Sequence, residues 1–361
     1  MILRVNEIKK YLQHIFPNKR IELKEINRIS GETVKEDMKG YGYGEPLLIT
    51  VTIDQQEKKF VLSTVKPGGF GHDFFYDRAK ILLFAHSSYN KLPRHVRSID
   101  VGTFLKDGSL VSLGNAEEFF LIMEYVEGDE YFKDLERIKN SGKLEELDIK
   151  RVRALSDYLV EIHFVKKSAP DLYIRRVREL LGDGEQIMGL IDSYDPKADF
   201  LEEGELIRIE KKCVEWRWKL KNKTHRLCQV HGDFHPWNVK FRKGTDFTVL
   251  DRSRGEWGEA ADDVSCMAIN YLFFSIQKYG ELKGPFEKLW KTFIENYLEE
   301  TGDNEVMEVI QPFFAWRGLV IASPIWYPTM SPEIRRRIFN FISNVLETDI
   351  FDYKAVNSYL K

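Results

Sequence analysis

The residues best suited to chemistry lie in one short stretch of the chain, residues 227–251, whose sequence is LCQVHGDFHPWNVKFRKGTDFTVLD. Two apolar runs in this stretch flank a polar turn. Asp233 follows the first run, and Asp251 follows the second. Asn238 lies five residues beyond Asp233, and Asp251 lies 18 residues beyond it. A carboxylate on a rigid loop can accept a hydroxyl proton, and amide and carboxylate oxygens are suitable ligands for Mg²⁺.

This arrangement of side chains predicts phosphoryl transfer. An Asp followed by an Asn five residues later, and then by an Asp at the end of a strand, is the pattern of the catalytic and metal-binding loops of kinases. Phosphoryl transfer needs an acceptor for the hydroxyl proton and oxygen ligands for Mg²⁺. The remaining catalysis is mostly positioning and charge stabilisation.

The same stretch permits a second interpretation. His231, Asp233 and His235 alternate along the sequence, so on an extended segment they would share one face. With Asp251 as a fourth ligand, they would suit a zinc or di-iron hydrolase. In the phosphotransferase interpretation, His231 orients the loop through hydrogen bonds and His235 packs beside the following proline. The asparagine at the position that a kinase loop requires favours phosphoryl transfer.

The elements that must position these residues change in character near Gly128. Before this point, residues 47–53 and 59–65 predict paired strands, residues 73–86 predict a helix, and residues 118–126 predict a buried strand. The first part of the chain is therefore expected to be a small antiparallel sheet crossed by one helix.

After Gly128 the sequence is mostly helical in pattern, and together the two parts predict an α+β fold. Helices are expected at residues 149–164, 173–181, 206–220, 264–279, 285–300 and 332–348. The strand-rich stretch that carries Asp233 interrupts them.

Several motifs together resemble the aminoglycoside phosphotransferase and choline kinase superfamily. HGDFHPWN is similar to the family's HGDxHxxN loop, and VLDRSRGEWGEAADDVS is similar to its metal-binding segment. In the latter, Gly258 and Asp263 lie seven and twelve residues beyond Asp251. LIMEYVEG at 121–128 resembles the family's interlobe hinge, and LVEIH at 159–163 resembles its LxxLH helix. The resemblance extends from about residue 20 to residue 340.

The resemblance implies a bilobal, protein-kinase-like fold. Residues 1–126 would form a nucleotide-binding lobe with a small antiparallel sheet, and residues 127–361 would form a larger, mainly helical lobe that binds the acceptor. ATP and Mg²⁺ are the implied cofactors, and the implied reaction moves the γ-phosphoryl group to a hydroxyl of a small molecule.

The resemblance also implies roles for individual residues. Asp233 would be the catalytic base, and Asn238 and Asp251 would bind Mg²⁺. The backbone of the hinge would hold adenine, and its residues are Glu124, Tyr125 and Val126.

The chain departs from the family pattern in the first lobe. Ser63, in FVLS, takes the place of the lysine that clamps the α- and β-phosphates. Lys66 follows three residues later and would point to the other face of a regular strand. Gly42, in KGYGYGEP, suits a loop over the nucleotide phosphates, although the spacing of the glycines is irregular. These departures leave open a nucleotide-binding pseudokinase with a regulatory role.

Charged residues follow Asp251. Asp263 is expected to cap the next helix and to tie down the catalytic loop, rather than to bind metal. Arg252 and Arg254 would either pair with acids of their own loop or bring positive charge to the transferred phosphoryl group or an anionic acceptor. Such charge disfavours an aminoglycoside, which is a polycation.

The composition limits the remaining possibilities. The 361 residues carry 54 Lys and Arg against 57 Asp and Glu, so the net charge of −3 gives no reason to expect a nucleic-acid partner. The uncharged stretches are shorter than the ~20 apolar residues of a membrane span, so no membrane partner is expected. Three cysteines without metal-site spacing favour a reduced, cytoplasmic location. The oligomeric state is unknown from sequence.

Overall fold

A computed structural model describes residues 4–28, 46–68 and 71–361 of the chain. The chain divides into two compact units, Met1–Met123 and Glu124–Lys361, and each is described by itself. The predicted lobes, with a boundary at residue 126 and separate roles in nucleotide and acceptor binding, stay predictions.

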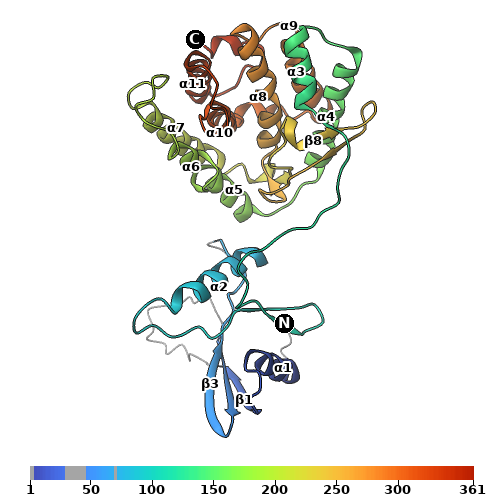
Figure 1. Cartoon of the computed structure of the whole chain (residues 1–361). Coiled ribbons are helices and arrows are strands. Elements are labelled where there is room, and N and C mark those ends of the chain that lie inside the picture. Colours follow the sequence, from blue (N-terminus) through green and yellow to red (C-terminus); the bar gives the residue numbers. More distant parts are fainter. Residues whose placement is uncertain (1–3, 29–45, 69–70) are drawn as a thin grey trace. The chain divides into compact units, whose positions relative to one another are not determined.

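The N-terminal unit contains a three-stranded antiparallel sheet with the strand order β1-β2-β3 (Figure 1). The strands are β1 (Ile21–Arg28), β2 (Leu47–Ile53) and β3 (Gln56–Leu62). Asp54 and Gln55 join β2 to β3 in a two-residue turn with φ of 47° and 71°, as the right-handed twist of a hairpin favours. Helix α1 (Val5–Ile15) packs Ile8 and Leu12 against the apolar face of this sheet. The predicted pair of strands is confirmed.

The rest of the N-terminal unit consists of α2 (Phe75–Tyr89) and a short hairpin of β4 (Gly102–Phe104) and β5 (Leu110–Ser112). The predicted buried strand at residues 118–126 is wrong. These residues have no regular secondary structure, and Phe120, Leu121 and Ile122 are 79–85% exposed. A strand needs a neighbour to pair with its backbone groups, and no strand in the described residues pairs with this segment.

The C-terminal unit is mainly helical (Figure 1). Its longer helices are α3 (Phe132–Ser141), α4 (Glu146–Phe164), α5 (Pro170–Gly182), α7 (Glu205–Leu220), α8 (Ala260–Tyr279), α9 (Gly284–Thr301), α10 (Gln311–Ala322) and α11 (Pro332–Leu346), with a short α6 (Ile187–Ile191). Helix α8 is apolar on nearly all sides, as expected of a helix inside a core, and α3, α4, α9 and α10 all contact it.

Two small antiparallel sheets lie among these helices. One has the strand order β6-β8-β9, and its strands are β6 (Asp129–Glu130), β8 (Val239–Phe241) and β9 (Phe247–Val249). The other pairs β7 (Cys228–Gln229) with β10 (Trp257–Gly258). Helices with small antiparallel sheets confirm the α+β fold class. None of the helices in the described part of the chain has both the length and the apolar composition of a membrane span.

Candidate active site

The loop between β7 and β8 carries Asp233, and the first turn of α8 holds it in place. The buried carboxylate of Asp263 accepts hydrogen bonds from the backbone N–H groups of His231 and Gly232, both at 2.7 Å. Burial alone would raise the pKa of Asp263, but the hydrogen bond from His163 and the nearby histidines lower it overall. The ionised carboxylate therefore fixes the loop just before Asp233.

The predicted role of Asp263 is confirmed in one part and wrong in the other. It ties down the loop, but it does not cap α8, because the helix begins earlier than expected and Glu259 is its N-cap. His163, from the predicted LVEIH helix, lies 3.2 Å from the Asp263 carboxylate through Nε2. Its Nδ1 lies 2.9 Å from the hydroxyl of Tyr297.

Asp233 is buried, and its two carboxylate oxygens have different surroundings. Oδ1 accepts a hydrogen bond from Nη1 of Arg317 at 2.7 Å. Oδ2 lies 3.6 Å from Nε2 of His235 and 3.6 Å from Nη2 of Arg254. Burial alone would raise the pKa of Asp233, but His235 and the charges of Arg317 and Arg254 lower it well below its ordinary value. The side chain is therefore an ionised carboxylate at neutral pH.

Arg317 is the functional residue that sequence reasoning missed. It comes from α10, and its side chain is 5% exposed. Besides Asp233, its guanidinium donates to the carbonyl of Gly232 at 2.9 Å and to Asp262 at 2.6 Å, and it stacks on Trp316 at 3.7 Å. One signal was present in the sequence: Arg317 is the single charged residue in the apolar helix QPFFAWRGLVIA, and a buried charge needs a partner.

The structure brings Asn238 next to Asp233, and the segment that carries Asp251 next to Asn238. The side-chain amide of Asn238 donates to the backbone carbonyl of Asp233 at 3.1 Å. The backbone N–H of Leu250 donates to the carbonyl of Asn238 at 2.8 Å, continuing the ladder between β8 and β9. Asp251 follows directly, with φ of 55° and an exposed side chain that has no hydrogen-bond or ion-pair partner among the described residues. These amide and carboxylate oxygens fit the donor set that Mg²⁺ prefers.

The two histidines of the loop bind its own backbone. Nδ1 of the buried His231 accepts from the N–H of Asp233 at 3.3 Å, and burial lowers the pKa of His231. Nδ1 of His235 accepts from the N–H of Trp237 at 3.2 Å. Within the described residues, no group of three His, Cys, Asp or Glu side chains is arranged to hold a metal ion. The hydrogen bond that His231 accepts from the N–H of Asp233 agrees with its expected role in orienting the loop.

The residues that were predicted to contact the nucleotide lie outside this loop in the sequence. Glu124, Tyr125 and Val126 begin the C-terminal unit, and the carbonyl of Val126 accepts from Lys240 of β8 at 3.2 Å. Ser63 and Lys66 follow β3 in the N-terminal unit and are exposed. Gly42 lies outside the described residues. The roles of these residues in nucleotide binding stay predictions.

The two arginines after Asp251 do not pair with the side chains of their own loop. Arg252 donates to the backbone carbonyls of Val230 and Glu256, at 2.9 Å each. Arg254 lies beside Asp233 and pairs with Glu185 at 3.1 Å. Arg254 therefore places positive charge beside Asp233, and its expected role toward the transferred phosphoryl group or an anionic acceptor stays a prediction.

A comparison with protein families assigns the chain to a family. Residues 95–304 match the phosphotransferase enzyme family. The match spans more than half of the chain, and the chain therefore belongs to this family. The resemblance drawn from the sequence motifs is confirmed. No curated protein sequence matches the chain.

Similar solved structures are kinases of small molecules. An ethanolamine kinase from Plasmodium vivax is 16% identical and aligns over 94% of this chain and 80% of its own, with a TM-score of 0.35. A choline kinase from Streptococcus pneumoniae is 12% identical over 94% of this chain and 98% of its own, with a TM-score of 0.34. An amicoumacin kinase is 15% identical over 88% of this chain and 90% of its own, with a TM-score of 0.42. At these values they add nothing to the family assignment.

Proposed function

We propose that this phosphotransferase moves the γ-phosphoryl group of ATP to a hydroxyl group of a small molecule that is not an aminoglycoside. One observation carries the proposal. An ionised, buried Asp233 contacts Asn238, whose backbone pairs with the residue before Asp251, and the side chains of Asn238 and Asp251 carry oxygen donors for Mg²⁺. Family membership supports the reaction class.

Asp233 acts through its second carboxylate oxygen. Arg317 occupies Oδ1, whereas the basic nitrogens nearest to Oδ2, from His235 and Arg254, are 3.6 Å away. Oδ2 accepts the hydrogen bond of the acceptor hydroxyl and aims its oxygen at the γ-phosphorus. As the new O–P bond forms, the bond from the γ-phosphorus to the bridging oxygen of ADP breaks. The hydroxyl proton passes to Asp233 and then to solvent. Because the transition state is loose, orientation matters more than the basicity of the carboxylate.

Asn238 and Asp251 would hold the metal ion. When bound, Mg²⁺ neutralises charge on the phosphates and orients them. Asn238 contributes its side-chain oxygen, since its side-chain nitrogen already donates to Asp233. Asp251 contributes an exposed carboxylate.

The backbone of the segment Glu124–Val126 is proposed to hold the adenine ring. Lys66 is proposed to contact the phosphates in place of the lysine that Ser63 replaces, and Gly42 to lie in the loop over them. A cytoplasmic location is proposed as well. It suits ATP-dependent chemistry and the three buried, unpaired thiols of Cys213, Cys228 and Cys266.

The proposal is tested by separating nucleotide binding from turnover. Calorimetric titration with Mg²⁺–ATP should show binding to the wild type and to Asp233→Ala alike. ADP release in the presence of pooled hydroxyl compounds should fall by roughly 10²–10⁴-fold in Asp233→Ala, the range for loss of a positioned acid–base group. Unchanged turnover in this variant would refute the role of Asp233.

A nucleotide-binding pseudokinase is the second candidate, and Ser63 is the observation that favours it. It predicts that Mg²⁺–ATP binds but that no ADP is released with any acceptor. Turnover of the unchanged chain distinguishes the two. An active phosphotransferase releases ADP with at least one hydroxyl acceptor, whereas a pseudokinase releases none. No comparable observation favours the metal-dependent hydrolase, and Nδ1 of both His231 and His235 accepts a backbone N–H of their own loop.

A further inference from the structure

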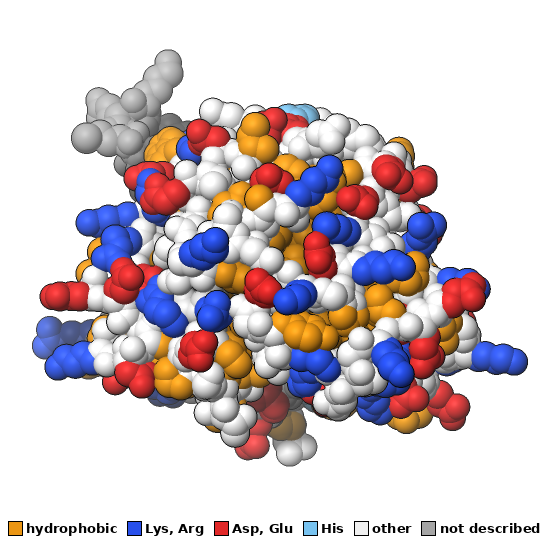
Figure 2. Space-filling view, turned by 90° about the horizontal axis from the view of Figure 1, so that it is seen from above, with side chains coloured by type: hydrophobic (Ala, Val, Ile, Leu, Met, Phe, Trp, Pro, Cys, Tyr) orange, Lys and Arg blue, Asp and Glu red, His pale blue; other side chains and the backbone are white. Residues whose placement is uncertain are grey.

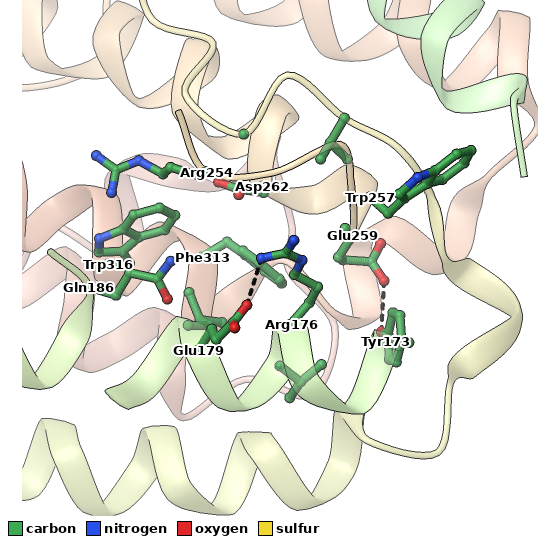
Figure 3. Close-up of a pocket in the computed structure, with 15 residues that line it drawn as sticks. Tyr173, Arg176, Glu179, Gln186, Arg254, Trp257, Glu259, Asp262, Phe313 and Trp316 are labelled. Atoms are coloured by element: carbon green, nitrogen blue, oxygen red, sulfur yellow. Dashed lines mark hydrogen bonds and ion pairs between the residues drawn. The ribbon is translucent and has the colours of Figure 1, made fainter. Parts of the chain in front are cut away.

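A small cavity lined by apolar and charged side chains lies beside the catalytic loop, entirely within the C-terminal unit (Figure 3). Its volume is about 40 Å³, which is room for a few water molecules. Gly232, the residue before Asp233, forms part of its wall. The charged residues of its lining are Arg176, Glu179, Arg254, Glu259 and Asp262. A group bound here lies next to the residue that orients the acceptor hydroxyl.

Arg254 connects this cavity to Asp233. Its Nη2 lies 3.6 Å from Oδ2 of Asp233, and its guanidinium packs over the ring of Trp316 at 5.0 Å (Figure 3). Its Nη1 pairs with Glu185, whose side chain is 82% exposed. Such an exposed ion pair contributes only about 0–1 kcal/mol. Its Nε is buried and has no hydrogen-bond partner in the part of the chain that the structure describes. An incoming anion can therefore displace Glu185 at little cost.

Arg176 reaches the same wall from α5. Figure 3 shows its guanidinium directed into the cavity, with Glu179 beside it. Gly255, which follows Arg254, has φ of 106°, and a Cβ there would lie 2.3 Å from Nη2 of Arg176. The absence of a side chain at Gly255 thus lets the Arg176 guanidinium approach the backbone next to Arg254.

The acidic residues of the cavity are already neutralised. Each pairs with an arginine: Glu179 with Arg176 at 2.6 Å, Glu259 with Arg226 at 2.7 Å, and Asp262 with Arg317 at 2.6 Å. Among the described lining residues, no carboxylate therefore remains to bind a cation. A cationic group entering the cavity would meet guanidinium groups and gain no compensating partner.

We propose that the acceptor carries a compact anionic group, a carboxylate or a phosphate, which Arg254 and Arg176 bind in this cavity while its hydroxyl reaches Asp233. The planar fork of a guanidinium group matches either anion. The small volume admits an anionic group of a few atoms and not a whole sugar ring. The inference rests on the proposed function, since it names the class of acceptor that the phosphotransferase would use.

The test compares probes that share one carbon skeleton and differ in charge. They are glycerate, glycerol 3-phosphate, glycerol and 3-amino-1,2-propanediol. Binding is measured calorimetrically at constant ionic strength, with and without Mg²⁺ and a non-hydrolysable ATP analogue. We expect at least one anionic probe to bind roughly tenfold or more tightly than glycerol, as charge-assisted hydrogen bonds allow. The preferred probe distinguishes a carboxylate from a phosphate ligand. Equal binding of all four probes, preference for the amine, or no binding of either anion would overturn the proposal.

Matched variants locate the anion site. Arg254→Gln and Arg176→Gln should each abolish the preference for the anionic probe. Arg178→Gln removes the same charge from an exposed position of α5, two residues from Arg176, and should leave the preference intact. If Arg178→Gln loses the preference equally, the effect is one of general charge and the cavity is not the site. If Arg254→Gln retains it, the proposal is wrong. Equal unfolding midpoints establish that all three variants are folded.

Failure of this inference is distinct from failure of the proposed function. Binding of the ATP analogue without selection for an anion contradicts only the anionic acceptor. Absence of nucleotide binding contradicts the phosphotransferase, whichever probe the cavity prefers.

Discussion

Arg317 connects the candidate base to the helical core. Its guanidinium lies between the carboxylates of Asp233 and Asp262 and also binds the carbonyl of Gly232. Burial raises the pKa of Asp262 more than Arg317 lowers it, so the pKa of Asp262 is about 6. Removing the guanidinium would deprive the buried Asp233 and the partly buried Asp262 of a shared countercharge. Together with His235 and Arg254, Arg317 keeps Asp233 ionised, and it occupies one of the two carboxylate oxygens.

Substitution of Arg317 by Met should therefore affect stability and turnover together. We expect a loss of about 3–5 kcal/mol in the free energy of unfolding, the usual result of breaking a buried ion pair from one side. Urea denaturation measures this loss, and ADP release measures turnover. The control is Arg337→Met, a partly exposed arginine of α11 whose ion pair is with a largely exposed glutamate. Equal stability of the two variants would contradict the role given to Arg317.

Gly232 is a second residue whose type the loop requires. Its φ is 85°, and a Cβ would lie 3.3 Å from the Cβ of Arg254. Substitution by Ala should cost about 1–2 kcal/mol, because a left-handed conformation strains any residue with a side chain. The unfolding midpoint measures this loss. The control is Gly244→Ala. Gly244 also has a positive φ, of 69°, but a Cβ there would meet no atom within 4 Å, so this substitution measures backbone strain alone. A smaller loss for Gly232→Ala than for the control would argue against close packing at this loop.

At the scale of elements, the site depends on the first turn of α8 holding a loop from another part of the chain. Asp263 accepts two backbone N–H groups of that loop, and His163 of α4 lies against its carboxylate. The hairpin of β8 and β9 brings Asn238 and Asp251 together by its register, Val239 opposite Val249. The position of Asp233 is therefore set by a helix, and that of the metal ligands by a hairpin.

Asp263→Asn tests the hold that α8 has on the loop. An asparagine keeps the shape of the side chain but replaces one acceptor oxygen with a donor, which would face a backbone N–H. Leaving a buried donor unsatisfied costs about 1–3 kcal/mol. We expect slower turnover with Mg²⁺–ATP affinity nearly unchanged, as measured by ADP release and calorimetry. Wild-type turnover in this variant would show that the loop is positioned in another way.

Local patterns in the sequence predict what local interactions determine. The β2–β3 hairpin follows from alternation and a polar turn, and most helices follow from their apolar spacing. The HGDFHPWN motif by itself places Asp233 and Asn238 on one loop, because only four residues separate them. The prediction for segment 118–126 is wrong because its apolar composition says nothing about whether another strand pairs with it. Arg317 escapes sequence reasoning because its contact with Asp233 spans 84 residues and depends on how α10 packs.

At the scale of the whole molecule, near-neutral net charge is reflected on the surface. Figure 2 shows Lys and Arg side chains intermixed with Asp and Glu over one face of the molecule. The proposed selectivity for an anionic acceptor rests on the guanidinium groups of Arg254 and Arg176 rather than on the total charge of the chain.

Asp251→Ala should remove the dependence of nucleotide binding on Mg²⁺. Ligand at 100 times its dissociation constant stabilises the folded chain by about 2.7 kcal/mol, so Mg²⁺–ATP should raise the melting temperature of the wild type measurably. The variant should lose the part of this shift that requires Mg²⁺. Asp246→Ala, a surface aspartate in the same hairpin that pairs with Arg242, is the control. A full Mg²⁺-dependent shift in Asp251→Ala would exclude it as a metal ligand.

The most direct test of the central claim is to look for the product of phosphoryl transfer. The chain is incubated with Mg²⁺–ATP and pooled small hydroxyl compounds, including hydroxy acids, and followed by ³¹P magnetic resonance. The account predicts that a phosphomonoester signal grows at the rate at which the γ-phosphate signal of ATP disappears, and that Asp233→Asn produces none. Formation of the ester at the wild-type rate by Asp233→Asn, or loss of the γ-phosphate only to inorganic phosphate with every acceptor, would contradict it.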